Sequence, residues 1–456
     1  MKQFRESEAF LDNIKRIHMI GIGGSGMCPL AEILHSKGYV LTGSDNNVGD
    51  PLKRIQALGI KTYMGHKAEN ISDAQLVVYS AAISKDNPEI VEAERLGIPT
   101  MERSKLFGAI TRKYDNVIGV CGTHGKTTVT SILTQILVMN DYDPTAVIGG
   151  LLPLIGANGR AGQSEYMVCE ACEYVNTYHE LSPDITVLLN IDNDHLEFFK
   201  TMENLTASFR KFISMGKQTF INGDDPLCVK AAEDLQINVT TYGKNDGNDY
   251  QALNIRSGKR GMVFDVYHHS KKLTSIEMNV PGEHNVYNGL AAFSVAHSLG
   301  ICSDSIKNAI ETFGGAGRRF EYLCEKNDIT FADDYAHHPT EITATLSAAK
   351  SLNYNNVIAV FQPFTFSRTA LLKDDFINAL SIADKVILTP IMGSREVNSY
   401  GITSEQLAEK IENAICVKNF SEAKDAIWNV AKAGDIVITM GGGDVYKISH
   451  DIRDNC

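Results

Sequence analysis

The stretch Gly119-Val-Cys-Gly-Thr-His-Gly-Lys-Thr-Thr128 decides the fold of this chain. A short apolar run at 116–120 predicts a buried strand before it, and the apolar spacing of 129–137 predicts a helix after it. A glycine-rich turn between a strand and a helix is typical of phosphate binding, because backbone N–H groups turn inward and the helix N-terminus adds partial positive charge. We expect Lys126 to reach terminal phosphate oxygens and Thr127 to bind Mg²⁺. The spacing indicates a shorter variant of the usual P-loop, since Val120 stands where that motif has a glycine.

A second glycine-rich loop, Gly21-Ile-Gly-Gly-Ser-Gly26, lies between a predicted strand at 14–22 and a predicted helix at 27–37. The next predicted strand, 40–45, ends in Asp45. This is the dinucleotide-binding fingerprint, with an acid about 20 residues after the glycines. The pattern requires only a diphosphate at a helix N-terminus and a carboxylate near a ribose. A UDP-sugar satisfies those requirements as well as NAD does.

Composition narrows the class of protein. The 456 residues include 43 basic and 55 acidic side chains, a formal net charge of −12, which argues against a nucleic-acid partner. No apolar run is long enough to span a membrane, and the polar start of the chain has no signal-peptide pattern, so we expect no membrane partner and a cytoplasmic location. The nine cysteines suit reduced thiols, and we interpret Cys169 as a small apolar strand residue and Cys172 as another just past the strand, not as a redox or zinc pair.

The rest of the chain predicts further α/β units. A strand at 166–170 places Glu170 and then Glu173 at its carboxyl end, and a strand at 185–191 leads to His195. Alternating residues between 249 and 277 predict hairpin strands with a turn at His268 and His269. A polar bridge near 112–116 and a glycine-rich, basic stretch at 314–320 divide the chain into three predicted domains: 1–112, 113–315 and 316–456.

Four motifs taken together resemble the Mur ligase family over nearly the whole chain. They are Gly21-Ile-Gly-Gly-Ser-Gly-Met27, Gly122-Thr-His-Gly-Lys-Thr-Thr128, Asp333-Asp-Tyr-Ala-His-His-Pro339, and Phe361-Gln-Pro363 with Ser367-Arg-Thr369. The resemblance implies an α/β protein of three domains. The first would be Rossmann-like and bind a UDP-sugar, the second a P-loop ATPase with a mixed sheet, and the third Rossmann-like and bind an amino acid.

The resemblance also implies a reaction, with ATP and Mg²⁺ as cofactors, in the synthesis of peptidoglycan precursors. L-alanine would be joined to the lactyl carboxylate of UDP-N-acetylmuramate through an acyl phosphate. One alternative is a ligase that recycles a free tripeptide onto the same UDP-sugar. Another is a nicotinamide-dependent dehydrogenase built on residues 21–45, which leaves Lys126 and Thr127 without a purpose. A non-catalytic nucleotide-binding protein is the last, and the presence of Glu170 and His195 argues against it.

Roles for individual residues follow from the same resemblance. The expected metal ligands are Thr127, Glu170 and His195. The expected ATP-binding residues are Gly122, Thr123, His124, Gly125, Lys126, Thr127, Thr128, His284, Asn285, Asn288 and Arg319. The expected UDP-sugar-binding residues are Gly23, Gly24, Ser25, Gly26, Met27, Asp45 and Ser80. The expected catalytic residues are Lys126, Glu173, His195, His337 and Arg368. Arg319 and Arg368 resemble anion clamps, because a planar guanidinium suits carboxylate and phosphate.

The proton acceptor for the amine stays open between Glu173 and a group in the third domain, which comprises Asp334, Tyr335, His337 and His338. Three segments depart from the family pattern. Glu170-Ala-Cys-Glu-Tyr174 replaces the usual Glu-Ala-Asp-Glu-Ser, which keeps both glutamates but changes the polar network around them. Phe364 and Phe366 replace a histidine and a tyrosine, and Pro390-Ile-Met-Gly-Ser-Arg395 replaces an alanine-rich run. The last two departures leave the choice among alanine, glycine and serine open.

Overall fold

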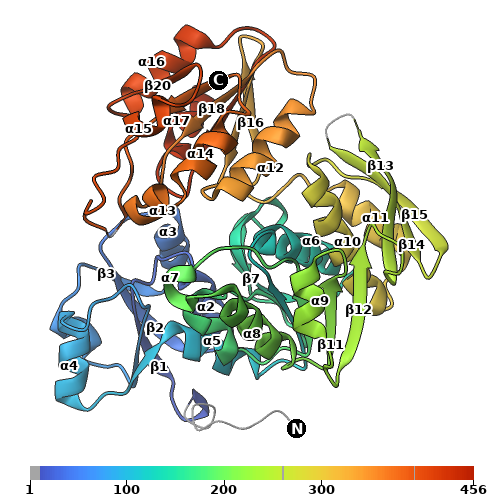
Figure 1. The fold of residues 1–456 in the computed structure, drawn as a ribbon. Coiled ribbons are helices and arrows are strands. Elements are labelled where there is room, and N and C mark those ends of the chain that lie inside the picture. Colours follow the sequence, from blue (N-terminus) through green and yellow to red (C-terminus); the bar gives the residue numbers. More distant parts are fainter. Residues whose placement is uncertain (1–10, 259–260, 395, 456) are drawn as a thin grey trace. The chain divides into compact units, whose positions relative to one another are not determined.

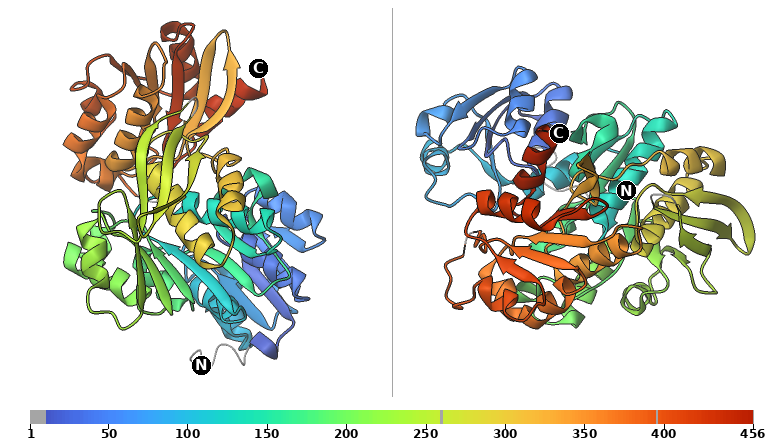
Figure 2. Two further views of the ribbon diagram at one scale, coloured as in Figure 1. Left: turned by 90° about the vertical axis from the view of Figure 1, so that its right-hand side faces the viewer. Right: turned by 90° about the horizontal axis from the view of Figure 1, so that it is seen from above.

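The computed structural model describes residues 11–258, 261–394 and 396–455, which form an α/β structure with three sheets (Figures 1 and 2). The chain falls into two compact units. Unit 1 comprises Met1–Leu253, Val266–Thr274 and Tyr287–Ile310, and unit 2 comprises Asn254–Asp265, Ser275–Val286 and Glu311–Cys456. No helix among the described residues is both long enough and apolar enough to cross a membrane.

The first sheet belongs to unit 1, has the strand order β3-β2-β1-β4-β5 and is parallel throughout. Its strands are β1 (Arg16–Ile20), β2 (Val40–Asp45), β3 (Lys61–Met64), β4 (Leu76–Tyr79) and β5 (Thr100–Glu102). Its helices are α2 (Cys28–Ser36), α3 (Asp50–Ala57), η1 (Ala68–Ile71), α4 (Pro88–Leu96) and α5 (Arg103–Thr111). The strand order reverses between β1 and β4, so the glycine loop after β1 lies at the switch point where open α/β sheets bind ligands.

The second sheet has ten strands in the order β15-β14-β13-β12-β11-β10-β6-β9-β7-β8. It is mixed, because β8 runs antiparallel to β7 while β6 is parallel to β9 and β10. Its strands are β6 (Asn116–Cys121), β7 (Thr145–Leu152), β8 (Ala157–Arg160), β9 (Tyr166–Glu170), β10 (Ile185–Leu188), β11 (Gln218–Asn222), β12 (Asn238–Gly243), β13 (Tyr250–Ser257), β14 (Met262–His268) and β15 (Lys271–Glu277). Its helices are α6 (Lys126–Met139), η2 (Pro153–Ile155), η3 (Tyr174–Glu180), α7 (Leu196–Phe199), α8 (Met202–Ile213), α9 (Pro226–Ala232), α10 (Glu283–Ser298) and α11 (Ser303–Glu311).

The third sheet belongs to unit 2, has the order β16-β17-β21-β18-β19-β20 and is parallel except for β16. Its strands are β16 (Glu321–Lys326), β17 (Ile329–Asp334), β18 (Val357–Phe361), β19 (Lys385–Leu388), β20 (Ala414–Cys416) and β21 (Ile436–Met440). Its helices are α12 (Pro339–Lys350), α13 (Phe366–Leu371), α14 (Lys373–Leu380), α15 (Glu405–Ala408), α16 (Phe420–Val430) and α17 (Tyr446–Asp454).

Strand β18 shows why the third sheet needs helices on both faces. Val357, Ala359 and Phe361 pack into one hydrophobic cluster, and Ile358 and Val360 pack into another. Successive side chains of a strand point to opposite faces, so a strand buried on both sides reads as an unbroken apolar run.

The three-domain α/β fold, with its mixed central sheet, is confirmed, while the boundaries at 112/113 and 315/316 stay predictions. The hairpin expected between 249 and 277 is present as β14 and β15, with His269 and Ser270 in the turn at positive φ. Helix α10 begins at Glu283. It starts directly after Gly282, where φ is +95°, and Asn285 donates a hydrogen bond to the Pro281 carbonyl.

Cysteines 169 and 172 sit at the end of β9 and just beyond it. Both are free thiols. Burial raises the pKa of the Cys169 thiol to about 12, which keeps it in the unreactive protonated form at neutral pH, whereas Cys172 is exposed.

Candidate active site

The phosphate-binding loop joins β6 to α6 through two glycines in backbone conformations that other residues rarely adopt. The φ of Gly122 is +136° and that of Gly125 is +86°. A Cβ at Gly125 would lie 2.6 Å from Oδ1 of Asn288, so the bare backbone lets this α10 side chain approach the loop. The predicted nucleotide-binding residues Gly125 and Asn288 are therefore brought together.

Asn190 fixes the same loop and was not predicted from the sequence. Its Oδ1 accepts a hydrogen bond from the His124 N–H at 2.8 Å, and its Nδ2 donates to the His124 carbonyl at 3.0 Å. The Asn190 carbonyl also accepts from the Thr123 N–H at 3.1 Å. These bonds explain why β10 ends at Leu188 and not at the predicted residue 191: the chain there bonds to the loop.

Lys126 is held at the rim of the loop. Its Nζ donates to the carbonyls of Gly122 at 2.6 Å and Thr123 at 2.9 Å, and it lies 3.0 Å from Oε2 of Glu173. The Glu173 side chain is only 3% exposed. Burial alone lowers the pKa of Lys126, but the charge of Glu173 raises it, and the net pKa is above its ordinary value. The lysine is thus a fixed positive charge beside the loop.

Thr127 and Glu170 form a pair of oxygen donors next to Lys126. The Thr127 hydroxyl donates to Oε2 of Glu170 at 2.9 Å, and the Gly149 N–H donates to the same oxygen at 2.8 Å. A Cβ at Gly149 would lie 2.4 Å from that oxygen, so the carboxylate sits directly on the β7 backbone. A hydroxyl and a carboxylate oxygen are the ligands that Mg²⁺ prefers. Two of the three predicted metal ligands therefore meet and fit the ion.

His195, the third predicted ligand, precedes α7 with a φ of +57°. Its ring centroid lies 4.9 Å from that of Tyr174, and its Nε2 lies 3.6 Å from Oδ2 of Asp194. Tyr174 is one of the residues that depart from the family pattern, so the change alters the surroundings of this histidine. A metal-binding role for His195 stays a prediction.

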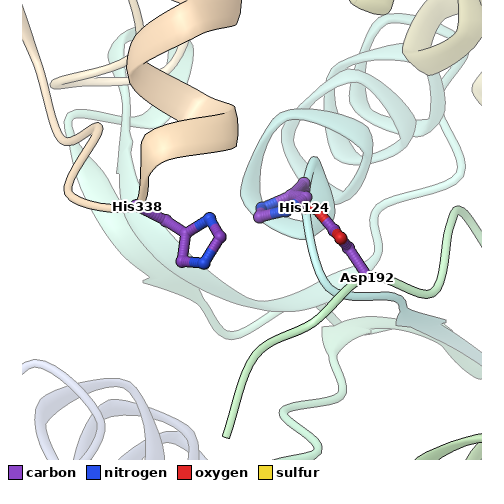
Figure 3. Close-up of side chains that lie close together, drawn as sticks. All are labelled: His124, Asp192 and His338. Carbon is purple, nitrogen blue, oxygen red and sulfur yellow. Dashed lines mark hydrogen bonds and ion pairs between the residues drawn. The ribbon is translucent and has the colours of Figure 1, made fainter. Parts of the chain in front are cut away.

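His124 points at Asp192 across the mouth of the loop (Figure 3). Its Nε2 lies 3.1 Å from Oδ2 of Asp192. The Asp192 N–H also donates to the Thr123 hydroxyl at 2.9 Å. Asp192 therefore holds two loop side chains at once, which orders the loop for a nucleotide.

The glycine loop at residues 21–26 is held by Asp45, the acid that the dinucleotide-binding fingerprint predicted. Oδ2 of Asp45 accepts from the Gly23 N–H at 2.9 Å, and Oδ1 accepts from the Asn47 N–H at 3.0 Å. Among the described residues, the N–H groups of Ser25 and Gly26 have no hydrogen-bond partner. The loop thus offers two adjacent donors, as a diphosphate requires. Contact of Asp45 with a ribose stays a prediction.

Arg103 was missed by the sequence analysis. A Cβ at Gly26 would lie 2.9 Å from Nη1 of Arg103, so the guanidinium rests on the glycine loop. In the described part of the chain this guanidinium has no hydrogen bond or ion pair to a protein group. A half-buried, unpaired arginine beside two free N–H groups is suited to an anion.

Two other predicted residues of the first sheet lie near its carboxyl edge. Met27 is buried at the residue before α2, and the Ser80 hydroxyl accepts a hydrogen bond from the Ala82 N–H at 3.3 Å just after β4. Their contact with a UDP-sugar stays a prediction.

In unit 2, Glu341 links two of the predicted residues. Its Oε2 lies 3.3 Å from Nδ1 of His337, and its Oε1 lies 4.0 Å from Nη1 of Arg319. The Phe364 ring, which replaces the family histidine, has its centroid 6.0 Å from that of His337. The predicted clamp residue Arg368 lies on the short helix α13.

His338 and Asp334, two of the candidate proton acceptors, both accept hydrogen bonds from backbone N–H groups. Nδ1 of His338 accepts from the Thr340 N–H and caps α12. The Asp334 carboxylate accepts from the N–H groups of Phe320 and Ala336, each at 2.7 Å. Burial raises the pKa of Asp334 to about 6, against the opposing effect of Arg319.

Comparisons with known proteins cover the same three regions. Residues 16–115 match the Mur ligase family catalytic domain, residues 120–296 the Mur ligase middle domain, and residues 318–443 the Mur ligase glutamate ligase domain. A UDP-N-acetylmuramate–L-alanine ligase of Clostridium novyi is 43% identical over 96% of this chain and 97% of its own. One from Caldicellulosiruptor saccharolyticus is 44% identical over 97% of this chain and 99% of its own.

Solved structures agree. The crystal structure of the UDP-N-acetylmuramate-alanine ligase of Thermotoga maritima matches with a TM-score of 0.83 and 27% identity, covering 96% of this chain and 98% of its own. A murein peptide ligase of Psychrobacter arcticus matches with a TM-score of 0.75 at 23% identity over 96% of this chain and 98% of its own, which shows the shared fold. With two phosphate-type loops, three matched domains and relatives of this identity along its length, the chain belongs to the Mur ligase family.

Proposed function

We propose that this protein joins L-alanine to the lactyl carboxylate of UDP-N-acetylmuramate, with conversion of ATP to ADP and phosphate. The activity for which relatives at 43–44% identity are named supports the substrates. The observation that carries the proposal is the cluster formed by Lys126 and Thr127, at the start of α6, and Glu170, at the end of β9, in a chain with a separate glycine loop at residues 21–26. A dehydrogenase would need only the glycine loop at residues 21–26.

In the first step, a lactyl carboxylate oxygen attacks the γ-phosphorus of ATP. The bond from that phosphorus to the β–γ bridging oxygen breaks, ADP leaves, and an acyl phosphate forms. Lys126 stabilises the charge that gathers on the transferred phosphoryl group, because its ammonium is held in place beforehand and needs no reorganisation. The N–H groups of the loop bind the remaining phosphate oxygens.

Mg²⁺ fits the donors present, with Thr127 and Glu170 as the residues that would hold it, and it would supply Lewis-acid neutralisation of the phosphate charge. In the second step, the neutral amine of L-alanine attacks the acyl carbon, and phosphate leaves through a tetrahedral intermediate. The amine must first lose a proton. Glu173 is engaged with Lys126 and His337 with Glu341, and the choice among Glu173, Asp334, Tyr335, His337 and His338 as the proton acceptor remains a prediction.

The tripeptide-recycling ligase is the alternative closest in chemistry, because it uses the same UDP-sugar and ATP. The two proposed reactions differ only in the amine donor. A release assay for ADP separates them. We expect turnover with UDP-N-acetylmuramate, ATP, Mg²⁺ and L-alanine together, and no turnover when any one is omitted. Preference for the tripeptide over L-alanine would replace the proposal with the alternative.

A further inference from the structure

Asn158, on the short strand β8 of the second sheet, contacts the glycine loop of the first sheet. Its Nδ2 donates a hydrogen bond to the Ser25 carbonyl at 2.8 Å. Its Oδ1 accepts a bond from Nη2 of Arg54 at 3.0 Å. The side chain is 8% exposed, so both ends of the amide are satisfied by protein groups in a buried position. All of these residues belong to unit 1.

The surroundings hold this amide in one orientation. Arg54 can only donate and the Ser25 carbonyl can only accept, so the Asn158 amide satisfies both in a single way. Arg54 is itself anchored, since its Nε donates to Oε1 of Glu32 at 3.0 Å. Next to it, a Cβ at Gly159 would lie 2.5 Å from the Cβ of Pro29, so strand β8 packs against α2 with no room for a side chain.

The bond to Ser25 bears directly on the ligand side of the loop. The Ser25 carbonyl and the Gly26 N–H belong to one planar trans peptide, so they point in opposite directions. Fixing the oxygen toward Asn158 aims the N–H away from it. A hydrogen bond to the carbonyl also polarises the peptide and strengthens its N–H as a donor. That N–H is one of the two without a partner in the described chain, and it lies beside Arg103.

We propose that Asn158 is a positioning residue for sugar-nucleotide binding: it fixes the Ser25–Gly26 peptide so that the Gly26 N–H binds the diphosphate of the UDP-sugar. This inference rests on the proposed function. It means that a residue of the middle domain contributes to the affinity of the first domain for the UDP-sugar. A sequence motif could not show it, because residues 25 and 158 meet only in the folded chain.

The test compares Asn158→Asp with Asn158→Ala. The aspartate has the same shape and still accepts from Arg54, but it cannot donate to Ser25. The alanine also removes the donor and adds no charge. Asn353→Asp, at an exposed position in unit 2, is the control for the added charge. Dissociation constants are measured by calorimetry for UDP-N-acetylmuramate, UDP, uridine and ADP, and thermal unfolding confirms that each variant is folded.

We expect both variants at position 158 to bind UDP-N-acetylmuramate and UDP about 10-fold more weakly than the wild type. Uridine and ADP should bind within about twofold, and kcat at saturating UDP-sugar should be unchanged within the same margin. If the aspartate is not tolerated, the alanine variant carries the test alone.

Three results would overturn the inference: wild-type affinity for UDP in either folded variant, equal weakening of uridine or ADP, or weakening by the aspartate alone. The last would show a charge effect and not a peptide orientation. A wild-type protein that binds ADP but not UDP-N-acetylmuramate would instead remove the proposed function, and this inference with it.

Discussion

The ammonium nitrogen of Lys126 lies 3.0 Å from Oε2 of Glu173, and both side chains are largely buried. A buried charge without its partner is costly, so each of these groups depends on the other. The pair also links α6 to the segment that follows β9, the strand that ends in Glu170. The position of the lysine is therefore set by a residue that the phosphate-loop motif does not contain.

Replacing either member of this pair should destabilise the fold. We expect Glu173→Gln to lower the free energy of unfolding by about 3 kcal/mol, because it leaves the Lys126 charge buried and unpaired. Lys126→Met should also lower it, and the double variant should lose clearly less than the sum of the two. Urea unfolding of all four proteins measures this cycle. Additive losses would mean that the two groups do not interact in solution.

Lys126→Ala should separate the two nucleotide sites. Without the ammonium, we expect turnover to fall by at least about 100-fold, since a fixed charge on the transferred phosphoryl group is lost. Binding of UDP-N-acetylmuramate should stay within about twofold of the wild type, because its loop follows β1 and not β6. Phosphate release and calorimetry measure the two effects. Loss of UDP-sugar binding would contradict this division of labour.

Replacing Arg103 tests whether the glycine loop at residues 21–26 binds the UDP-sugar. Arg103→Ala should weaken UDP-N-acetylmuramate binding by about 10-fold, the effect expected for losing a charged hydrogen bond. Lys105→Ala, two residues along the same helix and exposed, is the matched control and should have no effect. The KM for ATP should be unchanged in both. An equal effect of the two substitutions would point to general electrostatics instead of a contact by Arg103.

Asp334 should make the stability of the protein depend on pH. Its pKa is raised from 3.8 to about 6, so ionisation costs the folded state more than the unfolded state. The cost is absent below about pH 4, grows as pH rises toward about 6, and is complete above it. Relative to Asp334→Asn, the wild type should therefore lose about 1–3 kcal/mol of unfolding free energy across that interval.

Denaturant unfolding between pH 4 and 7 measures this difference, with Asp328→Asn, at an exposed position, as the control. Only the change in the difference with pH matters, because a constant offset reports the lost backbone hydrogen bonds of Asp334. Parallel curves for the wild type and Asp334→Asn would show that the carboxyl is not titrating in this range.

The sequence predicted those parts of the structure that are set by local backbone chemistry. The glycines at 122 and 125 have positive φ, and the strand predicted at 116–120 is present as β6 (Asn116–Cys121), which is buried from residue 117 onward. Thr127 and Glu170, which the family resemblance named together as metal ligands, meet because β6 and β9 are parallel and end at one edge of the sheet.

What the sequence did not predict depends on side chains that meet only after folding. Asn190 lies in an apolar run and reads as part of a strand, yet its amide bonds to the phosphate loop. Arg103 and Asn158 are far from residues 25 and 26 along the chain, and no local pattern marks them.

The proposed reaction requires that ATP activates the lactyl carboxyl group of UDP-N-acetylmuramate as an acyl phosphate. UDP-N-acetylmuramate labelled with ¹⁸O in both lactyl carboxylate oxygens tests it, with ATP, Mg²⁺ and, in parallel reactions, L-alanine, glycine and L-serine. An acyl phosphate passes one carboxylate oxygen to phosphate when the amine displaces it. We predict that mass spectrometry will find one ¹⁸O in each phosphate released and one in each amide formed with L-alanine. Unlabelled phosphate accompanying amide formation would contradict the account.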